Sequence, residues 1–344
     1  MTPRGPARSR WRLVLFVAVT ALAVGGASTY AVAERHHQLA ERKREPQVSR
    51  AAAGAFDATP RIVFRHTGLD RSYGLVATVS LDAPSGPREF TDVACDRVAA
   101  WRGGTSCLVI ERGVATRFEA RTYDAEWQPL GTRPLPGIPS RTRISADGRL
   151  VATTSFVTGH SYMTTGFSTE TVVREFNGGR DWGNLEEFTL FVDGRRTAPV
   201  DRNVWGVTFA GGDAFYATVS TGGRKWLVRG DLARRTLTTL AEGAECPSIS
   251  PDGSRLAYKV DLDPGGRTVW GLALHDLASD ERRVLTRRTR GVDDQVAWLD
   301  DDTLLYGMPR EEEPGVTDVW SLDTSPGAQP RLLIEQAWSP SVVR

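Results

Sequence analysis

The chain has 344 residues, of which 40% are hydrophobic and 25% are charged, a balance typical of globular rather than disordered proteins. Its 43 Lys and Arg residues against 42 Asp and Glu residues leave a formal net charge of +1, whereas nucleic-acid-binding proteins normally carry a basic excess. We therefore expect no nucleic-acid partner. The 34 glycines, 19 prolines and 10 tryptophans indicate many tight turns and buried aromatic rings, which favour an all-β fold over a helical bundle.

The N-terminal segment is apolar and has a basic start. Residues 1–12 carry four arginines and are expected on the cytoplasmic side, and the uncharged run 13–33 is long enough to cross a bilayer as a helix. Two interpretations remain open. We predict an uncleaved transmembrane anchor, which makes the protein a single-pass protein of the cell membrane. The alternative is a signal peptide cut near Ala33, where small residues precede the cleavage point, and a secreted product. Both place the rest of the chain outside the cytoplasm.

Residues 34–59 are polar and charged at first and then rich in alanine, with no apolar periodicity. This composition predicts a tether between the membrane segment and a folded domain, helical in part.

From residue 60 onward the pattern is one of short strands separated by turn residues. The clearest unit, 246–258, reads as a strand, a Ser-Pro-Asp-Gly turn and a second alternating strand, and 144–152 repeats it with Ser-Ala-Asp-Gly. Proline fixes φ for the first turn position, aspartate hydrogen-bonds nearby backbone, and glycine accepts a positive φ before the next strand. Looser copies at 205–216 and 296–306 give a spacing of about forty to sixty residues, typical of a four-stranded propeller blade.

These units carry a resemblance to a known family. The segment SISPDGSRLAYKV at 248–260 resembles the propeller repeat of TolB, and RISADGRLVATTS at 143–155 is a weaker match. The chain also resembles the TolB-like translocation proteins of actinobacteria, in which one membrane or signal segment precedes a propeller. Because residues 34–59 are too few for the N-terminal α/β domain of true TolB, we expect the propeller without it. The resemblance implies an envelope protein or peptide as partner.

The repeats predict a six-bladed β-propeller over 60–344, with seven blades as the alternative. The following ranges are the expected blades: 60–91, 92–137, 138–202, 203–243, 244–290 and 291–336. The first blade lacks an obvious inner strand, and the chain ends at 337–343 with what looks like the start of another repeat. We expect this C-terminal strand to complete the first blade and close the ring, which removes exposed sheet edges.

The three cysteines fit an extracytoplasmic domain. Cys95 and Cys107 fall on what the pattern predicts to be consecutive antiparallel strands of the second blade, so we predict a disulfide between them, with two buried thiols as the alternative. Cys246 is left without a partner and is expected to pack as a small apolar residue.

One long polar and aromatic connection, 158–169, follows the second strand of the third blade. In propellers the loops between second and third strands surround one mouth of the central channel, and long loops are often functional. We predict that His160, Tyr162 and Phe167 form a partner-binding surface. The alternative is an ordinary surface loop whose aromatic rings pack on the neighbouring blade.

Catalytic and metal-binding patterns are weak throughout. Gly159-His160-Ser161 has only the start of a nucleophile elbow, and the histidines show no metal-ligand spacing beyond the adjacent pair His36-His37 in the tether. The acidic runs 300–302 and 311–313 are expected to be solvated loops, with a calcium site as the sharper alternative. We therefore predict no catalytic residue, no metal and no cofactor.

Together these features predict a non-catalytic extracytoplasmic binding or scaffold protein of the cell envelope, which binds a protein or peptide through propeller loops. The competing hypothesis is a propeller hydrolase or small-ligand sensor with a site in the central channel. Such a site would gather carboxylates or histidines around the axis, but the expected inner strands offer Ser, Thr, Cys and Trp and few acids.

Overall fold

The computed structural model describes residues 7–41, 44–113, 115–159, 166–265, 268–286, 292 and 294–344. It divides into two compact units. One comprises Met1–Pro46 with Leu69–Tyr73, and the other comprises Gln47–Gly68 with Gly74–Arg344.

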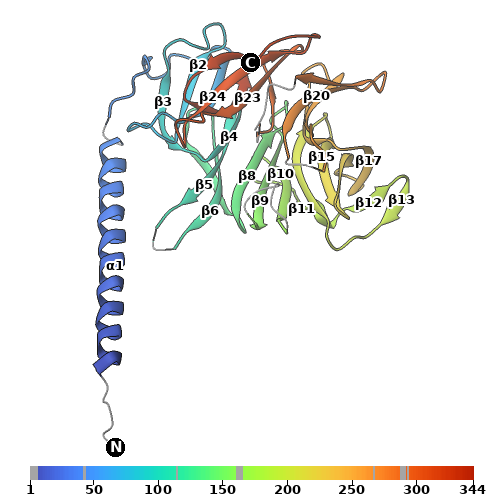
Figure 1. Ribbon diagram of the computed structural model, residues 1–344. Coiled ribbons are helices and arrows are strands. Elements are labelled where there is room, and N and C mark those ends of the chain that lie inside the picture. Colours follow the sequence, from blue (N-terminus) through green and yellow to red (C-terminus); the bar gives the residue numbers. More distant parts are fainter. Residues whose placement is uncertain are drawn as a thin grey trace, which may run out of the picture. The chain divides into compact units, whose positions relative to one another are not determined.

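The first unit is dominated by the helix α1 (Ala7–Glu41) (Figure 1). Its stretch Trp11–Val32 has a mean hydropathy of 1.9 over 22 residues, so it is long and apolar enough to cross a membrane, as both a signal sequence and an anchor are. The helix runs past the expected end at residue 33, so the start of the predicted tether is helical. Within this unit, Arg71 of the segment 69–73 pairs with Glu45 at 2.7 Å.

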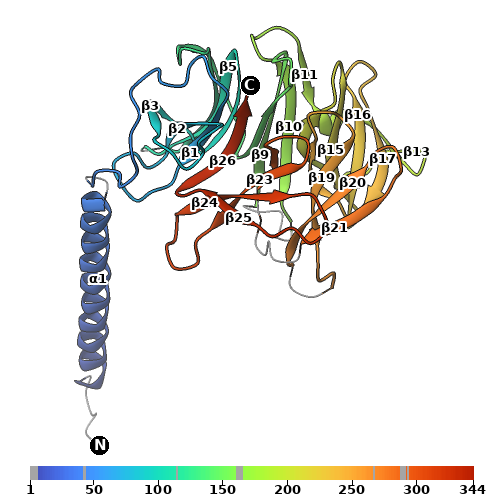
Figure 2. The same cartoon turned by 90° about the horizontal axis from the view of Figure 1, so that it is seen from above.

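The second unit is an all-β propeller, whose described strands form six sheets (Figures 1 and 2). The first blade contains β26 (Ala337–Val343), β1 (Arg61–His66), β2 (Leu75–Ser80) and β3 (Glu89–Ala94). The second contains β4 (Arg97–Trp101), β5 (Gly104–Glu111), β6 (Arg117–Tyr123) and β7 (Pro129–Pro134). The third contains β8 (Ile138–Ile144), β9 (Leu150–Thr158), β10 (Ser168–Glu175) and β11 (Asp181–Asn184).

The remaining three blades follow in chain order. The fourth contains β14 (Asn203–Phe209), β15 (Ala214–Thr221), β16 (Arg224–Asp231) and β17 (Thr236–Glu242), with β12 (Thr189–Val192) and β13 (Arg195–Thr197) added outside β17. The fifth contains β18 (Glu245–Ile249), β19 (Arg255–Asp261), β20 (Trp270–Asp276) and β21 (Arg282–Thr286). The sixth contains β22 (Ala297–Trp298), β23 (Thr303–Pro309), β24 (Thr317–Asp323) and β25 (Arg331–Ile334). We call β26, β4, β8, β14, β18 and β22 the inner strands.

The C-terminal strand closes the ring, as predicted. β26 pairs antiparallel with β1, with Arg61 opposite Val343 and His66 opposite Ala337. Figure 2 shows the red β26 beside the blue β1, although they come from opposite ends of the propeller sequence. The buried Arg88 fastens this closure, because its guanidinium donates to the carbonyl oxygens of Glu335 and Gln336. The ring is therefore closed by backbone pairing and by the hydrogen bonds of the Arg88 side chain.

The fourth blade departs from the expected boundaries. The expected third blade, 138–202, includes residues 189–197, yet these form β12 and β13 on the outer edge of the fourth sheet, where β12 runs parallel to β17. A 3₁₀ turn, η1 (Leu185–Glu187), brings the chain across. The segment joins the fourth sheet because Phe188 and Leu190 are buried there, in the core shared by the third and fourth blades.

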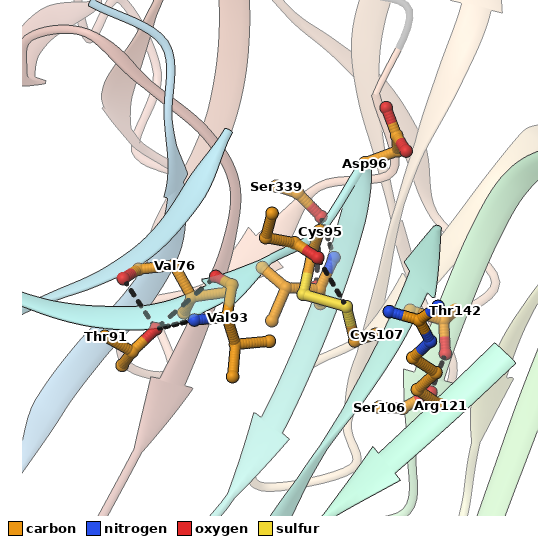
Figure 3. The surroundings of a disulfide bond; sticks show 12 residues. Val76, Thr91, Val93, Cys95, Asp96, Ser106, Cys107, Arg121, Thr142 and Ser339 are labelled. Atoms are coloured by element: carbon orange, nitrogen blue, oxygen red, sulfur yellow. Dashed lines mark hydrogen bonds between the residues drawn. A yellow bond between two sulfur atoms is a disulfide. The ribbon is translucent and has the colours of Figure 1, made fainter. Parts of the chain in front are cut away.

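The predicted disulfide is present. Cys95 and Cys107 are joined, with their Cα atoms 5.4 Å apart (Figure 3). Cys95 was expected on a strand, but it lies in the short link between β3 and β4. The disulfide therefore joins this link to β5. Cys246 is not part of a disulfide and is fully buried, in agreement with its predicted apolar role.

Candidate functional site

A large cavity lies where the six inner strands end. It has a volume of about 730 Å³ and is lined by residues of every blade, including the ends of β4, β8, β14, β18, β22 and β26. We call this cavity the funnel. Its size falls within the range of ligand-binding clefts in proteins, roughly 300–1,000 Å³.

The two best sequence repeats build part of the rim of the funnel. In each, the serine hydroxyl donates to the aspartate carboxylate, at 2.5 Å for Ser145 to Asp147 and 2.5 Å for Ser250 to Asp252. The serine oxygen also accepts a backbone N–H from the next strand, and the glycine N–H returns to the serine carbonyl. Hydrogen bonds from Ser250 and Ser254 lower the pKa of the Asp252 carboxyl to about 2, and the bond from Ser145 lowers the pKa of Asp147. These carboxylates are therefore structural parts of the turns.

Arginines next to these turns join the rim from blade to blade. Arg149 Nη2 lies 2.7 Å from Asp213 in the next blade, and Arg255 Nη2 lies 3.0 Å from Asp302. The acidic run 300–302 is thus engaged in the inter-blade contact. Across the described part of the chain, no group of three His, Cys, Asp or Glu side chains could hold a metal ion.

The wall of the funnel combines aromatic rings with hydroxyls that are already hydrogen-bonded. Trp101, Phe209 and Trp298 line it, and the Trp298 indole donates to the Ser248 carbonyl at 3.0 Å. Ser341 of β26 accepts from the Ala100 N–H at 2.9 Å and donates to the same residue's carbonyl at 3.0 Å. The Trp298 indole and the Ser341 hydroxyl are therefore satisfied within the protein, whereas the buried Trp101 indole N–H, in the same wall, has no acceptor among the described residues.

Backbone bulges shape the inner strands. Register shifts interrupt the pairing of β8, β14 and β18 with their neighbours and that of β26 with β1. In β14, Gly206 has a φ of +66° and faces Cys246, where an added Cβ would approach the Cys246 Cα to 2.6 Å. Only glycine fits there. Bulges re-aim the side chains beside them, and in β8 the bulge immediately precedes Arg141.

Two long side chains cross the channel at the bottom of the funnel. Arg143 of β8 donates to the carbonyl of Val296, which precedes β22 on the sixth blade, at 2.9 Å. Gln295, which precedes the sixth blade, donates to the carbonyls of Val207 in the fourth blade at 3.0 Å and of Pro247 in the fifth at 2.7 Å. Since these bonds link the third, fourth, fifth and sixth blades through the axis, they form the floor of the funnel.

Three arginines and one aspartate lie around the floor among the described residues. Beneath it lies a cavity of about 20 Å³, whose lining includes Arg97, Arg141 and Arg143 and one carboxylate, that of Asp294. Arg97 Nη1 and Asp294 Oδ1 are 3.9 Å apart. Burial lowers the pKa of the Arg143 guanidinium to about 10; Asp294 opposes this shift and Arg141 adds to it.

Of the three predicted partner-binding residues, the structure describes Phe167. His160 and Tyr162 are outside the described residues. Phe167 is partly buried, and its ring packs edge-on against Phe156 at 6.5 Å and Trp205 at 5.4 Å between ring centroids. In the pairing of β8 with β9, Ile138 faces Phe156 and Ile144 faces Val151, so β9 ends at the end of the blade opposite to the funnel.

Sequence reasoning missed the funnel and its floor. The one local signal is the Arg-Thr-Arg stretch 141–143 on a strand expected to be an apolar inner strand. Gln295 and Asp294 precede a strand of two residues, where no pattern indicates that their side chains reach the axis.

Comparison with known proteins agrees with the fold. No family model matches the chain, and no curated protein matches it. Among solved structures, the chain is similar to TolB from Acinetobacter baumannii, with 15% identity, a TM-score of 0.56, and coverage of 84% of this chain and 68% of that one. It is also similar to a chain of a nidogen/laminin complex, with 11% identity, a TM-score of 0.51, and coverage of 82% and 98%. An oligogalacturonate lyase in complex with manganese matches with 11% identity, a TM-score of 0.44, and coverage of 74% and 66%. The propeller is thus TolB-like in fold.

Proposed function

We propose that the protein is a non-catalytic, extracytoplasmic binding module of the cell envelope, whose funnel receives a segment of a protein or peptide partner. The observation that carries this proposal is the funnel itself: a cavity of about 730 Å³ at the axis, with a hydrogen-bonded rim and an aromatic wall. A rigid site binds its ligand with little ordering cost.

The proposed location follows from two features. The N-terminal helix fits a single-pass anchor, with a cleaved signal ending near Ala33 as the alternative. The Cys95–Cys107 disulfide fits an oxidising compartment, because cytosolic disulfides are rare. We therefore place the propeller outside the cytoplasm.

The connection 158–169 stays in the proposal as a second candidate surface, with His160, Tyr162 and Phe167 as its predicted contacts. The funnel is favoured because the Phe167 ring is engaged with Phe156 and Trp205. Contacts at the two ends of the inner strands would belong to different partners or to different parts of one partner.

The alternative function is a propeller hydrolase or small-ligand sensor that uses the same funnel, and its volume would suit a small molecule. The described lining contains no histidine, and its aspartates, Asp147 and Asp252, are tied into the rim turns. A thermal-shift panel with calcium and varied small ligands tests this alternative. Saturable stabilisation by one compound, lost in a funnel variant, would favour it.

Crosslinking in native membranes, followed by affinity purification and mass spectrometry, tests the proposal. We expect the tagged full-length protein to retain one envelope partner in near-equal amount. Ala146→Trp places a large side chain in the funnel at an exposed rim position, and it should abolish that recovery. Ala278→Trp, at an exposed turn that does not line the funnel, is the matched control and should retain the partner. Recovery of the propeller alone with several crosslinkers would contradict the proposal.

A further inference from the structure

Each of the six inner strands ends in an apolar residue that lines the funnel. These residues, one from each blade, form a ring that we call the collar: Trp101, Ile144, Phe209, Ile249, Trp298 and Val343. Phe209, Trp298 and Val343 are buried, and the other three are partly buried. Because the removal of apolar surface from water is favourable, a ring of this kind suits an apolar side chain of a ligand.

The funnel is closed below the collar. Arg143 and Gln295 cross the axis, and hydrogen bonds to backbone carbonyls of the fourth, fifth and sixth blades hold their side chains there. The cavity beneath them has a volume of about 20 Å³, which is room for about one water molecule. A polypeptide cannot continue past this level, so a segment that enters the funnel must leave through the same mouth.

The wall offers few polar partners to the backbone of an entering segment. Thr208 accepts a backbone N–H of β18 at 3.2 Å, and Ser341 exchanges two hydrogen bonds with the backbone of β4. The indole N–H of Trp101 and the Nε–H of Arg143 have no acceptor among the described residues, but both groups are buried and are not presented to the cavity.

These features favour a turn over an extended chain as the bound segment. Backbone N–H and C=O groups that leave water need hydrogen-bond partners, and a β-turn closes such a bond between its own first and fourth residues. A free chain end would carry a charged group into the collar, and burial of an unpaired charge is expensive. A turn also enters and leaves on the same side, as the closed floor requires.

We propose that the funnel recognises a tight β-turn of its partner, with an apolar side chain at the tip of the turn that packs inside the collar. This inference rests on the proposed function and deepens it, because it states the shape and the chemistry of the bound segment. The partner is accordingly a folded protein that presents a loop rather than a disordered tail.

The test uses the full-length protein in detergent micelles and two phage-displayed libraries. One library displays random loops of four residues closed by a disulfide, and the other displays linear peptides of the same length. We expect enrichment from the closed library, with an apolar residue at the tip of the loop. The enriched peptides should lose binding to Ala146→Trp, which obstructs the funnel, and should keep it with Ala278→Trp.

Calorimetry with synthetic peptides measures the two features separately. Replacement of the apolar tip residue with serine should weaken binding about ten-fold or more, because the collar loses its apolar contact. Opening the loop by replacing both peptide cysteines with serine should weaken binding several-fold, because the free peptide must then be ordered on binding.

A matched pair of variants on β8 tests the collar from the side of the protein. Ile144→Asn changes a partly buried collar residue at the funnel end of the strand and should weaken the closed peptides about ten-fold. Ile138→Asn changes a partly buried residue at the other end of the same strand and should leave their binding unchanged. Circular dichroism establishes that each variant is folded. If Ile144→Asn does not fold, the comparison of the apolar and serine peptides on the wild-type protein still decides.

The outcomes separate this inference from the proposed function. Enrichment of linear peptides alone, or of closed peptides that bind equally well with serine at the tip, would overturn the inference; if that binding is lost in Ala146→Trp, the proposed function stands. Enrichment of no peptide from either library would overturn both.

Discussion

The two ends of the inner strands are built differently. At one end the Ser-x-Asp-Gly turns, and the ion pairs of Arg149 with Asp213 and of Arg255 with Asp302, surround an open funnel. At the other end Phe156, Trp205 and Cys246 form a buried cluster against which Phe167 packs. The contrast teaches that the length of a loop does not indicate where a cavity lies. Phe167, at the end of the long connection after β9, packs on an apolar cluster, whereas short turns line the cavity.

The largest expected effect is at the packed end. Trp205 is fully buried, so Trp205→Ala should lower the free energy of unfolding by about 3–5 kcal/mol, the usual cost of removing a large core aromatic. Urea titration measures it, with Leu240→Ala, at an exposed position on β17, as the control. A cost as small as the control's would show that the cluster is not a core.

The disulfide comes next. Cys95 lies just before β4, at the same end as the packed cluster, and the bond closes a loop with a sequence separation of 12. Replacing both cysteines with alanine should lower stability by about 2–4 kcal/mol. Thermal melts with and without reductant measure this: reductant should destabilise the wild-type protein and leave the double variant unaffected. Equal sensitivity of both proteins to reductant would contradict the assignment.

Phe167→Ala sharpens the comparison directly, because the residue is also a predicted partner contact. Since its ring is partly buried, we expect a loss of stability of about 1–2 kcal/mol, with binding of the funnel partner unchanged. Chemical denaturation and affinity purification of the same variant give both readouts. Loss of the partner with stability intact would return the binding surface to the connection 158–169.

The smallest effect is at the funnel rim and depends on pH. The pKa of Asp252 is about 2 in the folded protein, below the ordinary 3.8, so its ionised form favours the folded state above about pH 4, and this stabilisation is lost as the pH falls toward 2. Asp252→Asn should therefore flatten part of the acid limb of a plot of melting temperature against pH. Asp263→Asn, at an exposed position in the same blade, should leave the plot unchanged. An unchanged acid limb in Asp252→Asn would contradict the role of the turn.

Much of the fold was predictable because its signals are local. A Ser-x-Asp-Gly turn determines its own geometry through contacts within six residues, so the sequence alone predicts that 145–150 and 250–255 are equivalent turns. The closing strand was predicted by a similar argument, since a blade without an inner strand and a chain ending in an extra strand complement each other.

The site was less predictable because its contacts are distant in sequence. Arg143 meets Val296 across the channel, and Gln295 meets Val207 and Pro247. The addition of β12 and β13 to the fourth blade likewise depends on where Phe188 and Leu190 find a buried surface. None of these contacts leaves a local pattern in the sequence.

Site-specific photocrosslinking tests the central claim most directly. A benzophenone amino acid is placed at Ala146, on the funnel rim, or at Val157, an exposed position at the other end of the third blade, and the full-length protein is irradiated in its native membranes. The account predicts a discrete crosslinked partner from Ala146 and none from Val157. A partner captured only from Val157 would contradict it and place the binding surface at the opposite end of the propeller.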